Sequence, residues 1–238
     1  MEEIQASKIR NRFGYYADRQ VHDDHWVRIN PTVTVQECDD LFAEMTEEIF
    51  SKHADLLKNT SLMVHLAFPP NKVRLFPGEN VSKEDALEPN FDSDSYDVRL
   101  APGKEIILES GILKECFITY TNYDSKYNFW YFTHTNSKKY EKYITDKFQL
   151  DGIELYHEWY FVYLSPGAQM GKHLDYLHHA MRYSFSVRQP ETDRSITIGE
   201  TNYYIPAGTA YIMDGTIPHE VSQTAESPRI MLLGAVVI

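Results

Sequence analysis

Apolar and polar positions follow two different periods along this chain of 238 residues. Residues 34–58 repeat apolar side chains at the spacing of three and four positions that is typical of an amphipathic helix. The apolar face consists of Cys38, Leu41, Phe42, Met45, Ile49, Leu56 and Leu57. Thr34 and Glu37 have the spacing of a capping box, which predicts that this helix begins there and packs on a sheet. Residues 137–148 also have a helical pattern.

From residue 158 onward, short strand-like runs replace the helical pattern. They read "EWYFVYLSPG", "MRYSFSVRQ", "SITIG", "NYYIPAG", "TAYIMDG" and "RIMLLGAVVI", and Gly or Pro separates them at nearly regular intervals. Many short strands between turn residues are typical of a β-sandwich or a small barrel. The high tyrosine content, 17 residues, favours β-structure as well. We therefore predict an α+β protein that is mainly β, with supporting helices.

The N-terminal part has a weaker pattern. Residues 1–30 are polar and aromatic by turns, and 68–104 are rich in the turn residues Pro, Gly, Asn and Asp. The stretches "CFITYTNY" and "NFWYFTHT" look like strands. Nothing resembles a flexible linker, so we predict a single domain, 1–238. Within it, 1–150 would form helical and mixed support that covers the substrate, and 158–238 would supply the main strands and the site.

Composition limits the partners that can be expected. The formal net charge of −12 disfavours nucleic-acid phosphates and anionic membrane surfaces. Two cysteines without a CxxC pair form neither a disulfide framework nor a zinc ribbon. No apolar stretch approaches the roughly 20 residues of a membrane span. We therefore expect a cytoplasmic protein that acts on a small molecule, without nucleic acid or membrane as a partner; its oligomeric state stays open.

The segment "GKHLDYLHHAMRYSFS", residues 171–186, concentrates side chains that bind metals. His173 and Asp175 are two positions apart, so on a strand they point to the same face. His219, which follows a Gly turn, can supply a third ligand from another strand. Two histidines and one carboxylate form the facial triad of non-haem Fe(II) enzymes, with open positions for a co-substrate and O2. The alternative interpretation is a polar loop that happens to be rich in histidine.

Other histidines compete with this interpretation. His178 and His179 lie outside the HxD spacing, and we interpret them as loop residues or substrate contacts. The cluster "VHDDHW" contains a second HxD, His22 to Asp24, but no distal His and Arg accompany it. A solvated turn is the simpler explanation for that cluster.

Arg229 is a candidate for binding a carboxylate next to the predicted metal site. It lies ten residues after His219, at the start of the last apolar run. A guanidinium there can form a bidentate pair with a carboxylate. Such a pair is what 2-oxoglutarate needs, because its 2-oxo acid end chelates iron and its far carboxylate requires a cationic partner. Tyr163, on the strand-like run that precedes His173, is a further candidate for a hydrogen bond to the co-substrate.

With these residues the chain resembles the Fe(II)/2-oxoglutarate-dependent dioxygenases of the double-stranded β-helix, or jelly-roll, fold. The finer resemblance is to the aspartyl/asparaginyl β-hydroxylase-like branch, which includes cis-type proline hydroxylases. It is carried by "YLSPGAQMGKHLD", "MRYSFSV" and "YYIPAGTAYIMDGTIPHEVSQTAESPRIMLL", about residues 158–238. The resemblance implies that three residues bind iron, that one arginine binds the 2-oxoglutarate C5 carboxylate and that a second lies near the co-substrate. These are His173, Asp175, His219, Arg229 and Arg182.

Two positions refine this comparison. Family members often carry a second His where this chain has Ser184, whose hydroxyl can still donate one hydrogen bond. Asp175 is neither Gly nor Ala, which favours hydroxylation or a related oxidation over halogenation. The resemblance thus predicts a hydroxylase of a free or carrier-bound amino acid, which converts 2-oxoglutarate to succinate and CO2. The alternatives are a peptidyl Asp/Asn β-hydroxylase and a non-catalytic, cupin-like jelly roll that binds a metal or ligand.

Overall fold

The structure is a computed structural model of the chain. It describes residues 8–10, 16–18, 20–22, 26–58, 60–67, 76–77, 96–120, 128–134, 138–147, 154–173, 181–190, 195–215, 217–221 and 226–237. The helices are α1 (Val35–Lys52), the 3-10 helix η1 (Ala54–Leu57) and α2 (Lys138–Lys147). The N-terminal strands are β1 (Lys8–Arg10), β2 (Tyr16–Asp18), β3 (Gln20–His22), β4 (Trp26–Ile29), β5 (Ser61–Ala67), β6 (Phe76–Pro77), β7 (Tyr96–Leu108), β8 (Gly111–Tyr120) and β9 (Asn128–His134). The C-terminal strands are β10 (Glu154–Leu164), β11 (Met170–His173), β12 (Met181–Arg188), β13 (Ile196–Ile198), β14 (Thr201–Tyr203), β15 (Ala210–Met213), β16 (His219–Val221) and β17 (Arg229–Val237).

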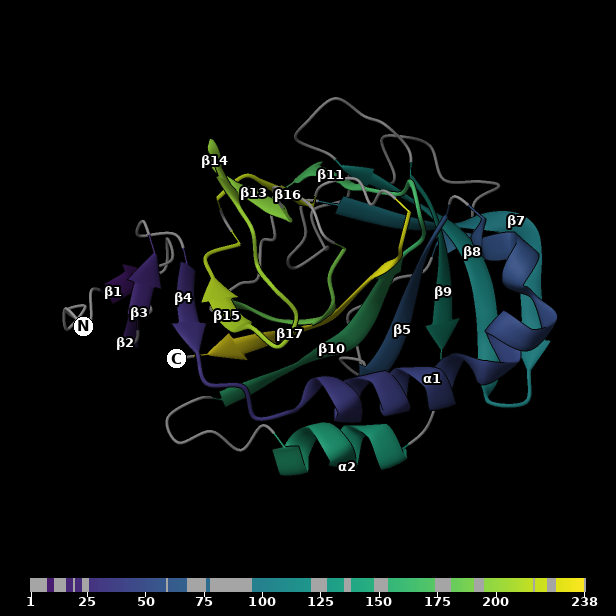
Figure 1. Cartoon of the computed structure of the whole chain (residues 1–238). Helices are drawn as coiled ribbons and strands as arrows, with labels where there is room; N and C mark the ends of the chain where they lie inside the picture. The colour runs from purple at the N-terminus through teal and green to yellow at the C-terminus, as the bar shows by residue number, and fades with distance from the viewer. Residues whose placement is uncertain are drawn as a thin grey trace.

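The strands form one large and one small sheet, besides the β1–β2 pair (Figure 1). The large sheet has the order β3-β4-β15-β12-β17-β10-β5-β9-β8-β7-β6, and the small sheet has the order β11-β16-β13-β14. The eight strands from β10 to β17 divide equally between the two sheets. This mostly β architecture with few helices is consistent with a jelly-roll oxygenase fold.

Helix α1 covers the face of the large sheet that points away from the small sheet (Figure 1). Its predicted capping box is present, since the Thr34 hydroxyl accepts from the Glu37 amide at 3.1 Å and Glu37 accepts from the Thr34 amide at 2.9 Å. The predicted apolar face is buried at Cys38, Leu41, Phe42, Met45 and Ile49. No helix in the described part of the chain is long and apolar enough to cross a membrane.

The side of the large sheet that each residue faces follows from strand register. Paired residues of antiparallel strands share a face, and alternate residues change face. The face toward α1 carries Phe161, Tyr183, Phe185, Val187 and Ile230, all of which belong to the main apolar core. The opposite face lies between the two sheets, and it carries the buried polar side chains of Arg182, Ser184, Ser186 and Arg229.

Trp159 and Gly234 make a close contact within the large sheet. They are paired across β10 and β17, and a Cβ at Gly234 would lie 2.5 Å from the indole ring. Glycine is therefore required for the backbone to approach the buried Trp159 side chain.

The structure differs from the sequence-based prediction in the N-terminal part. Strand β5 was not anticipated, and β7 extends over residues 96–104, which belong to the segment rich in turn residues. The Pro102-Gly103 pair that indicated a turn is accommodated where the β7–β8 register shifts, between Leu100 and Glu105. A β-bulge tolerates residues that would interrupt a regular ladder. Apart from Phe76–Pro77, the predicted loop 68–95 lies outside the described residues.

Candidate metal centre and co-substrate pocket

His173 and His219 lie side by side on the small sheet. They are direct partners in the antiparallel pairing of β11 with β16. Their ring centroids are 4.2 Å apart, and each residue is 4% exposed. Two imidazoles that the sequence expected to converge from distant positions therefore do so.

The ring nitrogens of this pair have defined roles. Nδ1 of His173 lies 2.7 Å from the Gly171 carbonyl oxygen, and Nδ1 of His219 lies 2.8 Å from that of Ile217. A carbonyl oxygen can only accept, so each Nδ1–H is the donor. In the neutral ring, Nε2 then carries the lone pair that can bind a metal, and the carbonyl fixes the ring orientation. This donor set fits a divalent transition metal.

The predicted third ligand, Asp175, lies outside the described residues, as do His178 and His179. Asp23 and Asp24 of the rival cluster lie outside them too. Among the residues that are described, no group of three His, Cys, Asp or Glu side chains is placed to hold a metal. The histidine pair is thus the part of the predicted triad that the structure describes.

Arg229 is the first residue of β17 and is fully buried. Its Nε donates to the side-chain oxygen of Gln189 at 3.0 Å. Burial lowers the pKa of Arg229 to about 10, which still leaves the guanidinium charged at neutral pH. Arg229 thus places a buried positive charge on the face between the two sheets.

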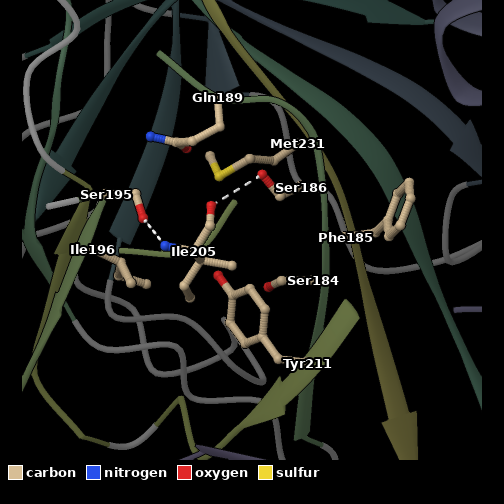
Figure 2. A pocket seen from close by; sticks show the side chains of 9 residues that line it. All are labelled: Ser184, Phe185, Ser186, Gln189, Ser195, Ile196, Ile205, Tyr211 and Met231. Carbon is tan, nitrogen blue, oxygen red and sulfur yellow. Dashed lines mark hydrogen bonds between the residues drawn. The ribbon is translucent and has the colours of Figure 1, made fainter. Parts of the chain in front are cut away.

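Gln189 lines a small cavity (Figure 2). Its side chain also accepts the hydrogen bond from Arg229. The volume of the cavity is about 10 Å³, close to that of a single water site. The lining residues are Ser184, Phe185, Ser186, Gln189, Ser195, Ile196, Ile205, Tyr211 and Met231. Four hydroxyl groups and one amide among them give the cavity the hydrogen-bonding character that a carboxylate requires. Ser184, predicted near the co-substrate, lies in its wall.

A second polar row crosses the same face of the large sheet. Arg182, which is 2% exposed, places its guanidinium carbon 5.7 Å from the centre of the Tyr160 ring. His65 on β5 stacks on that ring, with centroids 5.1 Å apart. His65 was not predicted from the sequence, although a single histidine within the apolar run "SLMVHLA" is a signal for a buried polar residue.

Tyr163 does not lie with these residues. It is paired with Ile230 and Leu62, on the face covered by α1. Its ring packs on Phe42 and Phe50, at centroid distances of 6.1 and 5.2 Å. The expectation that Tyr163 contacts the co-substrate is therefore wrong, because alternation along β10 turns it away from the space between the sheets.

Comparison with known proteins agrees with this geometry. Residues 138–237 match the family of aspartyl/asparaginyl β-hydroxylases. Over this segment the chain is similar to these hydroxylases. The match runs from α2 through β17 and includes both histidines and Arg229. It confirms the branch predicted from the sequence, and with it the class of enzyme, an oxygenase.

Solved structures similar to this chain include three oxygenases. A prolyl-4-hydroxylase of Pseudomonas putida is 14% identical, with a TM-score of 0.38, and the match covers 90% of this chain and 92% of that one. A 2OG-Fe(II) oxygenase family protein of Burkholderia pseudomallei is 10% identical, with a TM-score of 0.33 and coverage of 57% and 73%. The Escherichia coli ribosomal oxygenase YcfD is 11% identical, with a TM-score of 0.34 and coverage of 81% and 51%. No curated protein matches the chain.

Proposed function

We propose that this protein is an Fe(II)/2-oxoglutarate-dependent dioxygenase. The observation that carries the proposal is the His173–His219 pair, oriented through Nδ1, in a β-fold that also buries Arg229. In this proposal β10 to β17 form a double-stranded β-helix. Residues 1–238 form a single domain, because N-terminal strands extend the large sheet on both sides.

His173, Asp175 and His219 would hold the iron. Ferrous iron, when bound, supplies O2 activation coupled to the oxidative decarboxylation of 2-oxoglutarate to succinate and CO2. The protein holds the two imidazoles in one tautomer through the Gly171 and Ile217 carbonyl groups. Pre-set ligands lose little rotational freedom when the metal binds.

Arg229 would bind the C5 carboxylate of 2-oxoglutarate. Ser184 would donate a hydrogen bond from the neighbouring cavity wall, and Arg182 would contact the co-substrate from the same strand, β12. The cavity is narrow, so the flexible Met231 side chain has to move when a dicarboxylate enters. Burial of these groups excludes water and strengthens their electrostatic interactions with the co-substrate.

The proposed substrate is a free or carrier-bound amino acid, or a metabolite derived from one. The small-molecule assignment rests on the single predicted domain and the acidic charge. The family match favours one further candidate, an aspartyl or asparaginyl residue of a peptide. Both candidates undergo the same chemistry, insertion of oxygen into a C–H bond.

Succinate formation tests the function. Protein with Fe(II), ascorbate, 2-oxoglutarate and O2 is incubated with single amino acids and, separately, with Asp- and Asn-containing peptides. We expect one class to raise succinate output and to gain one oxygen atom by mass spectrometry. An Asp175→Asn variant should lose most of this activity, because it replaces an anionic ligand by a neutral amide. No succinate under any condition, with iron bound, would leave a non-catalytic jelly roll as the function.

A further inference from the structure

The pairing of β12 with β17 shifts by one residue at Val187. Up to Ser186, which faces Met231, the register is regular, but beyond it Arg188 faces Ile230. Without the shift, Arg188 would lie opposite Arg229. The extra residue places Gln189 opposite Arg229 instead. β-bulges near active sites commonly redirect a side chain in this way.

The bulge also separates the two cations. Arg188 is exposed on the face that carries α1, and its Nε donates to the Asp39 carboxylate at 2.8 Å. Arg229 stays buried on the other face, with Gln189 as a partner. The charge of Arg188 is thus used to attach β12 to α1 and does not repel Arg229.

The orientation of the Gln189 amide is determined at both ends. Its side-chain oxygen accepts from Arg229 Nε at 3.0 Å, and its Nε2 donates to the Pro190 carbonyl at 3.3 Å. If the amide were reversed, its N–H groups would face Nε–H of Arg229 and its oxygen would face the carbonyl oxygen of Pro190. Gln189 also lines the cavity described above. One side chain therefore links the buried guanidinium to the cavity.

A neutral partner has a consequence for charge. A carboxylate at position 189 would form an ion pair with Arg229, and such a pair is strong in a buried site. An amide fixes the guanidinium plane by one hydrogen bond but leaves its net charge in place. Gln189 therefore adds no carboxylate that would compete with an incoming anion for Arg229.

We propose that the Val187 bulge and Gln189 set the co-substrate specificity of this protein for 2-oxo acids that carry a distal carboxylate. Gln189 is a positioning residue: its amide oxygen orients the guanidinium of Arg229 and adds no negative charge beside it. The inference rests on the proposed function and adds to it the residue that keeps Arg229 selective for a dicarboxylate.

The test compares three variants, all handled without oxygen. Gln189→Glu supplies a competing carboxylate, and Gln189→Met removes the hydrogen-bonding amide at similar size. Asn202→Asp, on exposed β14, is the matched control for added charge. The metal-free form of each protein is first titrated with Fe(II) by calorimetry. The Fe(II)-loaded form is then titrated with 2-oxoglutarate and with 2-oxopentanoate, which has the same chain length but no distal carboxylate.

We expect Gln189→Glu to weaken 2-oxoglutarate binding by about ten- to a hundredfold, the range for loss of a charged hydrogen bond. Gln189→Met should weaken it by roughly tenfold. Affinities for Fe(II) and 2-oxopentanoate should be unchanged in both, and Asn202→Asp should match the wild type throughout.

Two results would overturn the inference while leaving the proposed function intact. One is wild-type affinity of Gln189→Glu for 2-oxoglutarate. The other is an equal loss of affinity for both 2-oxo acids, or a loss for Fe(II), which would indicate general damage to the fold. Failure of the wild-type protein to bind 2-oxoglutarate while it binds Fe(II) would refute the proposed function and this inference together.

Discussion

The two histidines of the candidate centre show how backbone carbonyl groups select a tautomer. Each Nδ1–H is directed to the carbonyl oxygen two residues earlier in the chain, at 2.7 Å in His173 and 2.8 Å in His219. Replacement of either ring removes a metal donor and leaves a buried carbonyl without that hydrogen bond.

His219→Ala should therefore abolish iron-dependent succinate formation and weaken divalent metal binding, since two remaining ligands rarely retain ferrous iron. His53→Ala, at the C-terminal cap of α1, is the matched control and should bind metal normally. Fe(II) titration calorimetry and a turnover assay measure the two effects. Undiminished metal affinity in His219→Ala would show that the metal binds elsewhere.

Arg229→Ala should raise the apparent KM for 2-oxoglutarate by at least tenfold, because the charge lost is fully buried and sits where a carboxylate would bind. The iron requirement should change little. Initial rates measured at varied 2-oxoglutarate concentration give the KM, and rates measured at varied Fe(II) concentration give the iron requirement. An unchanged KM for 2-oxoglutarate would mean that another cation binds the co-substrate.

Residue identity could be predicted from the sequence more easily than residue orientation. The HxD spacing and the later His and Arg drew attention to His173, His219 and Arg229, because these residue types are suited to binding a metal and a carboxylate. The structure places the two histidines side by side and buries the arginine. Tyr163 was misplaced because a period of two defines two faces without telling which one is inward. Its direction is decided by α1, a distant part of the chain that packs on that face.

At the scale of elements, β10 and β17 form the centre of the large sheet, and their contact depends on Gly234. An added methyl group would lie 2.5 Å from the Trp159 ring, so one of the two strands would have to shift. Overpacking of this kind typically costs about 1–3 kcal/mol.

Gly234→Ala should lower the free energy of unfolding by about that amount, as measured by urea denaturation. The second substitution Trp159→Leu should recover part of the loss in the Gly234→Ala background, since the smaller side chain vacates the space. A double-mutant cycle over the four proteins gives the coupling. Simple additivity of the two losses would contradict a direct clash.

The C-terminal elements were predictable because Gly and Pro separate them. The N-terminal strands β5 and β7 were not. Strand β5 is a short run between a helix and a polar segment, and β7 contains a Pro-Gly pair that normally marks a turn. In both cases neighbouring strands of the large sheet, rather than local preference, determine the extended conformation.

At the scale of the whole molecule, α2 is attached to α1 by two ion pairs. Lys147 pairs with Glu37 and Lys139 pairs with Glu44. The hydrogen bond from each lysine lowers the pKa of its carboxyl group below the usual 4.5. Because these groups are substantially exposed, solvent screens the pairs, and their contribution is small.

A lowered folded-state pKa means that the stabilisation is complete above pH 4.5 and is lost as the pH falls through the folded pKa. The double variant Lys139→Met/Lys147→Met should therefore be less stable than the wild type at pH 7, and the difference should shrink toward pH 3. Urea midpoints at the two pH values, at low and high salt, measure it. Lys58→Met removes an exposed local pair between Asp55 in η1 and the residue that caps η1, so it measures the effect of one pair that does not join two helices. A difference that grows on acidification would refute the assignment.

The large sheet continues without interruption from β10 into β5 and β9, strands that precede the family-matched segment. A fragment of residues 138–237 would lack β5, the neighbour of β10 in the large sheet. The backbone hydrogen-bonding groups on that edge of β10 would be exposed and could pair with a strand of another molecule. Such a fragment should precipitate on expression, whereas the full chain should remain monodisperse in size-exclusion chromatography. The part of the chain that precedes the family-matched segment would then be the part that prevents this segment from aggregating.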